Sequence, residues 1–413
     1  MSENKNTPAG QTQFEEGSLK VRKLTPLEVT FAVVGCGIGS GCLGTAYSAR
    51  LAGFPVITFW LIVSGITTLF SMYYVAETAL RTRRMMQLPG LAERYVGPVG
   101  KILVFLAVTL NAFSCLIAYF NGSGNIINTL LGIPGWVGTL MFLIPGMLVV
   151  FFGLKAVGMA GKYLSIAMTV MLIILCGASL ISKNADLSRL FVSNWSYAIP
   201  IFNVAAFSYI GQYLVPDLAR GLSHDPKKLA PAMLAGQIIT AALLILVPLG
   251  CFVISPADEI SQVATIAWGQ ALGSWALYTA NIFALIAMFT SFCPISQTLI
   301  SSIVDFFKFR SDSDNAIRVP IMLVVYGIPL VLVFGNLVGF VDAIYFSGTF
   351  CAAIMAILPV FMINKARKEG DFEPVWNCGW MASMPVQVLI VILYGGTVAY
   401  AIFGAMGFLP AGW

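Results

Sequence analysis

Charged residues are scarce in this sequence, since only 10% of its 413 residues are Asp, Glu, Lys or Arg while 58% are hydrophobic. A soluble domain carries roughly 25% charged residues, so the composition excludes an ordinary soluble protein. Histidine occurs once, at His224, and the eight cysteines form no CxxC pair. Because no carboxylate or lysine lies deep in an apolar run, neither a metal-centred nor a Ser-His-Asp enzyme is expected.

The sequence also lacks a recognisable cleavable signal peptide and a basic region suited to nucleic acid. Residues 1–26 are polar, and the apolar run that follows them is interpreted as an integral span. Basic clusters at 81–84 and 365–368 are interpreted as determinants of membrane topology, with binding of anionic membrane lipid as the alternative. The scattered cysteines are typical of small core residues rather than of disulfides or a metal site.

Apolar runs fill the rest of the chain, and each is long enough to cross a hydrocarbon core about 30 Å thick. Backbone groups in lipid must find their partners within the segment, so these runs predict helices. We therefore expect an all-α polytopic membrane protein, with a cytoplasmic tail at 1–26 and a single transmembrane domain at 27–408. The eleven predicted transmembrane helices cover residues 27–49, 55–79, 102–131, 136–154, 163–182, 198–221, 229–254, 273–306, 318–336, 339–363 and 385–408.

The positions of Lys and Arg predict the orientation of these helices. With the N-terminus inside, all but three of the 23 Lys and Arg residues fall on the cytoplasmic side, the exceptions being Arg50, Lys183 and Arg189. The sequence thus predicts a multi-pass protein of the bacterial inner membrane with a cytoplasmic N-terminus and a C-terminus outside. The third and eighth spans exceed the bilayer thickness and are expected to tilt or to continue beyond it.

Acidic residues fall near the cytoplasmic ends of the predicted spans, at Glu77, Asp217 and Asp305. Glu77 precedes Arg81 by four residues and Asp217 precedes Arg220 by three, which is the spacing of ion pairs on one helix face. We interpret both as pairs at the membrane surface or interface.

A glycine-rich stretch lies in the first span, which reads VVGCGIGSGCLGTAYSA. Each glycine costs about 1 kcal/mol of helix propensity relative to alanine, so five of them predict a broken helix. Unwound backbone at membrane depth is tolerated around a polar cavity, where freed N–H groups can hold a carboxylate and freed carbonyls a cation. Close helix packing is the alternative. A dinucleotide fingerprint is excluded, because the pattern is GxGxGxG and no βαβ unit surrounds it.

Two later spans carry polar residues of interest. In an inverted repeat the second break would fall five spans later, in 198–221, which contains Ser208, Tyr209 and, near its end, Pro216. Interhelical hydrogen bonds alone are the alternative there. In the eighth span, Ala287 precedes Thr290 and Ser291 by about one turn, and a carbonyl with two hydroxyls suits a hard cation such as sodium. The alternative is a hydroxyl bonded back to its own helix.

These features resemble the hydroxy/aromatic amino acid permease family, within the amino acid–polyamine–organocation superfamily. The similarity covers nearly the whole chain. It rests on VVGCGIGSGCLGTAYSARLAGF, the Glu77 end of the second span, LAERYVGPVGK, AYFNGSGNII, the TSF at 290–292 with VDFF after it, and ILPVFMINKARK. The resemblance implies a five-plus-five inverted-repeat transporter core with broken helices one and six, working by alternating access. The repeats would cover about 27–182 and 198–363, with an extra helix at about 385–408.

The resemblance also implies the function and the site. The protein would be no enzyme but a symporter that couples a hydroxy or aromatic amino acid to a cation. Backbone around Ser40 and Gly41 would hold the substrate carboxylate, backbone at 206–209 the amino group, and Tyr119 or Asn121 would line the pocket. The implied substrate-binding residues are Gly37, Gly39, Ser40, Gly41, Tyr119, Asn121, Ala206, Phe207, Ser208 and Tyr209. A sodium ion would be held by carbonyls of Gly35, Ile38 and Ala287 with the hydroxyls of Thr290 and Ser291.

Two departures from the family pattern concern this site. The sixth span reads AAFSYI where family members carry a TSFGFH-like stretch, which puts Tyr209 at the histidine position. The fifth span reads SIAMTVM where many members place a lysine. An amine near the cation site can replace sodium and carry a proton, so its absence favours Na⁺ over H⁺ as the coupling ion; no other cofactor is expected.

Several alternatives stay open. A carrier for a polyamine or organic cation is disfavoured, because no buried acid would pair with such a charge. A channel and a non-transporting membrane receptor are the other classes. Serine or threonine competes with tryptophan, tyrosine or phenylalanine as substrate, and import competes with exchange. The expected partners are the amino acid and membrane lipids, with no nucleic acid and no predicted oligomeric state.

Overall fold

The computed structural model describes residues 15, 19, 23–260, 264–335, 337 and 345–406. Most of the tail at 1–26, the start of the predicted span 339–363 and the end of the span 385–408 lie outside these residues. The described part is helical, with one isolated β-bridge between Glu15 and Arg84. Nine helices in this part are long and apolar enough to cross a membrane, so the protein is an all-helical multi-pass membrane protein.

The predicted span 27–49 consists of two helices, α1 (Pro26–Gly37) and α2 (Ser40–Ser48). Helix α1 begins where the sequence reads TPLE, because the Thr25 side chain accepts from the Glu28 backbone and the Glu28 carboxylate accepts from Thr25. Ile38 and Gly39 separate the two helices within the glycine-rich stretch.

The predicted span 198–221 is also discontinuous. Helix α8 (Ala198–Ser208) ends before a single turn, η3 (Gln212–Leu214), which leads into α9 (Val215–Gly221). Pro216 lies in the first turn of α9, where its missing N–H costs no helical bond. The interruption therefore lies at residues 209–211, upstream of the proline that suggested it.

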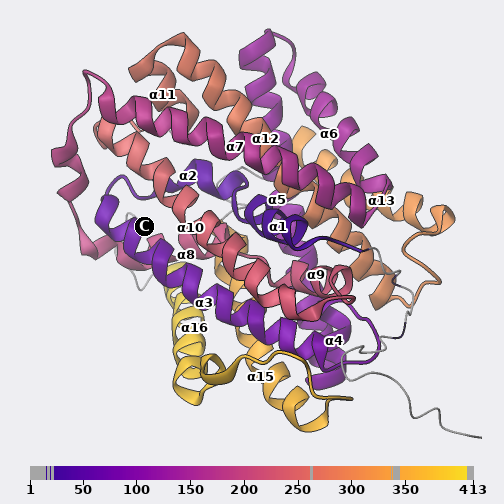
Figure 1. The fold of residues 1–413 in the computed structure, drawn as a ribbon. Helices are drawn as coiled ribbons and strands as arrows, with labels where there is room; N and C mark the ends of the chain where they lie inside the picture. The colour runs from indigo at the N-terminus through magenta and orange to yellow at the C-terminus, as the bar shows by residue number, and fades with distance from the viewer. Residues whose placement is uncertain are drawn as a thin grey trace, which may run out of the picture.

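Two very long helices cross the middle of the bundle. Helix α5 (Pro98–Leu131) has 34 residues and α12 (Ser274–Phe306) has 33, which corresponds to about 50 Å each. They pack against each other, and α1 packs against α12, α7 (Leu154–Ile181) and α10 (Leu229–Ile254). Helix α1 thus lies inside the bundle (Figure 1).

The remaining elements complete the bundle around this centre. They are α3 (Phe54–Leu80), α4 (Leu88–Tyr95), α6 (Gly135–Phe151), η1 (Leu187–Phe191), η2 (Trp195–Tyr197), η4 (Pro226–Lys228), α11 (Ala264–Leu272), α13 (Asn315–Phe334), the π-helical turn η5 (Ser347–Cys351), α15 (Ala352–Glu369), η6 (Gly379–Ala382) and α16 (Met384–Ala405). Helix α16, at the yellow end of the colour scale, lies at the edge of the bundle beside α15 (Figure 1). Seven cysteines are buried and Cys36 is half-buried, as expected for small core residues.

The two ion pairs expected at the membrane surface or interface are instead buried. Both Glu77 and Asp217 are 0% exposed. The Glu77 carboxylate accepts from Arg81 and Arg367 and from the backbone N–H of Cys378, so it joins α3 to α15 and to the loop after it. The expectation is wrong because spacing along one helix reveals the first partner but not the partners from distant segments.

Asp217 lies in a second buried network. It accepts from Arg220 at 2.6 Å, from Gln87 at 2.7 Å and from Thr298 at 2.8 Å. Arg220 also pairs with Asp312 at 3.2 Å. Helix α9 is thereby tied to the segment before α4, to α12 and to the α12–α13 loop, at what we call the α4 end of the bundle.

The loop after α15 is tied to the same end of the bundle. Asp371 accepts from the Arg94 guanidinium at 2.7 Å and from the backbone N–H of Arg83 at 2.6 Å. The Arg94 guanidinium lowers the pKa of Asp371, so the stabilisation by this pair is lost only as the pH falls through that lowered value.

Candidate functional site

The two helix interruptions face each other inside the bundle. Helix α2 packs against α8. A Cβ placed on Gly41 would lie 2.8 Å from the Ser208 hydroxyl oxygen, and one on Gly37 would lie 3.4 Å from the Ser208 carbonyl oxygen. At position 41 a side chain would crowd α8, so Gly41 lets the start of α2 lie against the end of α8.

A small cavity lies at this junction. Its walls come from the α1–α2 junction, from α5 and from the α8–η3 junction. The lining residues are Cys36, Gly37, Gly39, Gly41, Asn111, Cys115, Tyr119, Phe207, Ser208, Ile210 and Tyr213, and none of them is charged.

Helix ends supply the electrostatics of this uncharged cavity. Gly39 precedes the first turn of α2 and gives it no side-chain cap, so the first N–H groups of that turn lack a side-chain partner, an arrangement that favours anions. Helix α8 ends at Ser208, and the carbonyl groups of its last turn carry partial negative charge. The junction can therefore hold a carboxylate and an ammonium group of one zwitterion side by side.

Six of the residues expected at the site line this cavity, namely Gly37, Gly39, Gly41, Tyr119, Phe207 and Ser208. Ser40 is the first residue of α2. Ala206 is buried in α8 without lining the cavity. Tyr209 lines a neighbouring cavity of about 220 Å³ together with Met72 and Gln237. Asn121 is half-buried and lies outside the lining of either cavity.

Five lining residues did not emerge from the sequence: Cys36, Asn111, Cys115, Ile210 and Tyr213. Asn111 and Cys115 precede Tyr119 by eight and four residues on α5, so the three share one helix face. This spacing, together with an asparagine inside an apolar run, is the signal that could have predicted Asn111 and Cys115 as lining residues. Cys36 lies 2.9 Å from the Tyr213 hydroxyl and donates to the Ile210 carbonyl at 3.4 Å, which joins the two junctions.

Four of the residues expected to hold sodium, Gly35, Ala287, Thr290 and Ser291, lie close together. Ser291 donates to the Gly35 carbonyl and, at 3.4 Å, lies within reach of the Cys36 carbonyl. Thr290 donates to the Ala287 carbonyl at 2.9 Å, so the bond back to its own helix is present as well. Ile38 is fully buried at the end of α1. Carbonyl and hydroxyl oxygens from α1 and α12 thus lie within one small region.

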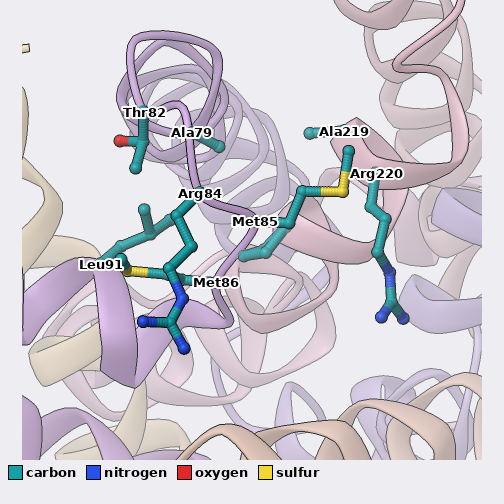
Figure 2. A pocket seen from close by; sticks show the side chains of 9 residues that line it. Ala79, Thr82, Arg84, Met85, Met86, Leu91, Ala219 and Arg220 are labelled. Carbon is teal, nitrogen blue, oxygen red and sulfur yellow. The ribbon is translucent and has the colours of Figure 1, made fainter. Parts of the chain in front are cut away.

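A separate cavity of about 330 Å³ lies at the α4 end of the bundle. It is lined by Ala79, Thr82, Arg84, Met85, Met86, Leu91, Pro216, Ala219 and Arg220, and Figure 2 shows both guanidinium groups directed to the same side. Arg220 is already paired with Asp217 and Asp312. Because this cavity touches neither helix junction, the cavity at the junctions is the candidate substrate site.

Comparisons with known proteins agree with this architecture. The tyrosine-specific transport system 1 of Haemophilus influenzae is 26% identical over 407 residues, covering 92% of this chain and 97% of the relative. The tyrosine-specific transport system 2 of the same organism is 22% identical over 393 residues, covering 87% and 93%. Both relatives therefore align with this chain over nearly their full length.

Two solved structures share the fold. MhsT in complex with L-phenylalanine superimposes with a TM-score of 0.66 at 16% identity, covering 92% of this chain and 100% of that one. Mhp1 is a nucleobase-cation-symport-1 family transporter, solved in a closed conformation with bromovinylhydantoin bound. It gives a TM-score of 0.62 at 12% identity, covering 97% and 95%. At such identities the likeness concerns the fold alone.

The family comparison extends over most of the chain. The model of the tryptophan/tyrosine permease family matches residues 25–402, from the residue that caps α1 to the last turns of α16. The match therefore includes both helix junctions and the cavity between them. This chain belongs to the tryptophan/tyrosine permease family and is a transporter rather than an enzyme.

Proposed function

We propose that the protein carries an aromatic amino acid, with tyrosine as the first candidate, across the bacterial cytoplasmic membrane by cation-coupled symport. The observation that carries this proposal is the uncharged cavity at the meeting point of α1, α2 and α8. The names of the two Haemophilus influenzae relatives support tyrosine as the substrate.

The substrate would bind as a zwitterion. Its carboxylate would accept from the free N–H groups at Gly39, Ser40 and Gly41, and its ammonium group would donate to the last carbonyls of α8. Since no acidic side chain lines the cavity, a net cation such as a polyamine would find no counter-charge there.

The order of helices supports a five-plus-five inverted repeat over about 27–182 and 198–363. The interrupted pair α1–α2 corresponds to α8 and α9, the 34-residue α5 to the 33-residue α12, and α7 to α15. Helix α16 would be the additional eleventh span. Alternating access would then arise because substrate and cation together bind the outward-open and inward-open states with different affinities. The proposed orientation places the N-terminus in the cytoplasm and the C-terminus outside.

Counterflow in proteoliposomes tests this proposal. Vesicles containing the purified protein are preloaded with each common amino acid in turn, and uptake of labelled tyrosine is followed in sodium and in choline buffer. We expect accelerated uptake with tyrosine and a small set of aromatic amino acids inside, and dependence on sodium. Folded protein that shows no counterflow with any amino acid would overturn the assignment.

Removing both hydroxyls of the proposed sodium site should change the response to the cation. We expect the variant Thr290→Ala/Ser291→Ala to need at least tenfold more sodium for half-maximal uptake, because two of its oxygen ligands are lost. The measurement is initial tyrosine uptake as a function of sodium concentration. Thr279→Ala is the matched control, since Thr279 also bonds back to α12 but at a half-buried position outside the proposed sodium site. A double variant with an unchanged sodium response would contradict the site.

A further inference from the structure

The cavity has a second end, remote from the helix junctions. A Cβ on Gly39 would lie 2.9 Å from the Tyr119 hydroxyl oxygen, so Tyr119 marks the end at the start of α2. Asn111 lines the same cavity two turns earlier on α5, which corresponds to about 12 Å along the helix axis. An elongated substrate held at the junctions would therefore direct its side chain towards Asn111.

Asn111 is held in one orientation by the π-helical turn η5. The Ser347 hydroxyl donates to the Asn111 side-chain oxygen at 2.6 Å; Asn111 is 1% exposed and Ser347 is 0% exposed. With its oxygen engaged by a hydroxyl donor, the amide presents its N–H groups as donors. π-Helical turns are rare and are frequently found at functional sites.

An aromatic side chain, Phe207, lies between the start of α2 and η5. A Cβ on Gly41 would lie 3.0 Å from the ring of Phe207, and one on Gly348 would lie 3.0 Å from the Cβ of Phe207. Phe207 thus spans from α2 to η5 and gives the cavity an aromatic wall. Gly348 makes this possible, because any side chain there would meet the Asn203 carbonyl at 2.6 Å.

We infer that Asn111, oriented by Ser347, donates a hydrogen bond to the ring hydroxyl of the substrate and so selects tyrosine over phenylalanine. This inference rests on the proposed function and names the residue that recognises the substrate side chain. A phenol oxygen accepts from the amide N–H groups, whereas phenylalanine leaves them buried without a partner. Sites built to bond a substrate hydroxyl reject the analogue that lacks it far more strongly than purely apolar sites do.

The test compares tyrosine and phenylalanine as competitors of labelled substrate in the same counterflow assay. For the wild type we expect tyrosine to compete at least tenfold better than phenylalanine. In Asn111→Leu, which has a similar size but no donor, we expect this ratio to fall to about one or to invert. Asn125→Leu makes the same change at an exposed position of α5 and should keep the wild-type ratio.

Ser347 provides an independent test in case the leucine variant does not fold. Ser347→Ala frees the amide to rotate and should lower the tyrosine preference at least threefold, whereas Ser347→Thr retains the hydroxyl and should restore it. If Asn111→Leu keeps the wild-type preference for tyrosine over phenylalanine, the inference is overturned. If Asn111→Leu is inactive, a wild-type preference in Ser347→Ala overturns it instead. Failure of the proposed function is seen separately, as a wild-type protein without counterflow of any aromatic amino acid.

Discussion

Gly41→Ala is expected to lower tyrosine counterflow at least tenfold, whereas Gly44→Ala should leave it near the wild-type level. The added methyl group at position 41 would lie 2.8 Å from the Ser208 hydroxyl oxygen and 3.0 Å from the Phe207 ring. At position 44 in the same helix it would meet nothing within 4 Å. Overpacking costs about 1–3 kcal/mol, and every 1.4 kcal/mol lost from binding is a tenfold change in affinity.

Initial counterflow rates at equal amounts of folded protein measure this difference. Gly41→Leu extends the series, since its larger side chain should fill the cavity and remove uptake altogether. Wild-type uptake in the leucine variant would show that the α1–α2 junction is not part of the substrate path. Equal losses at positions 41 and 44 would instead indicate a general effect on the helix.

Arg220→Ala should lower the free energy of unfolding by about 3–5 kcal/mol, because removing one partner of a buried ion pair leaves uncompensated charge. The Arg220 side chain is 2% exposed and pairs with two carboxylates, Asp217 and Asp312. Its loss would remove one cation from both carboxylates at the α4 end of the bundle. We expect a marked loss of folded protein on heating.

The matched control is an exposed pair with the same spacing. Lys228 pairs with Asp225 at 2.8 Å, and these side chains are 61% and 33% exposed. Lys228→Ala should cost less than about 1 kcal/mol, as is usual for surface pairs. The fraction of monodisperse protein that remains in detergent after a temperature series measures both variants. Similar midpoints for Arg220→Ala and Lys228→Ala would contradict a structural role for the buried network.

Much of the fold could be predicted from hydropathy and from the positions of glycine, because both determine local helix formation. The apolar runs predicted the long helices, and the glycine-rich stretch predicted the interruption between Gly37 and Ser40. In the sixth span, Pro216 indicated the correct segment. It lies in the first turn of α9, however, where a proline starts a helix rather than breaking one. The eleven-span count and the inverted repeat stay predictions.

The site was harder to predict, because it depends on which face each helix presents. Asn121 follows Tyr119 by two residues, and residues at that spacing do not face the same way on a helix. Asn111 is ten residues away from Asn121 in sequence, yet it shares the face of Tyr119. The buried networks were missed for a related reason, since Arg367 and Asp312 reach Glu77 and Arg220 only through the tertiary fold.

The uncapped start of α2 has a consequence for the empty carrier. This helix has only nine residues and is preceded by Gly39, which offers no side-chain cap. Short helices are marginal on their own, and a glycine at the N-cap stabilises the helix less than a capping side chain, by roughly a few tenths of a kcal/mol. A bound carboxylate would act as that cap, so the substrate itself would complete the helix. Amide hydrogens in the first turn of α2 should then exchange with solvent faster in the empty protein than with tyrosine bound.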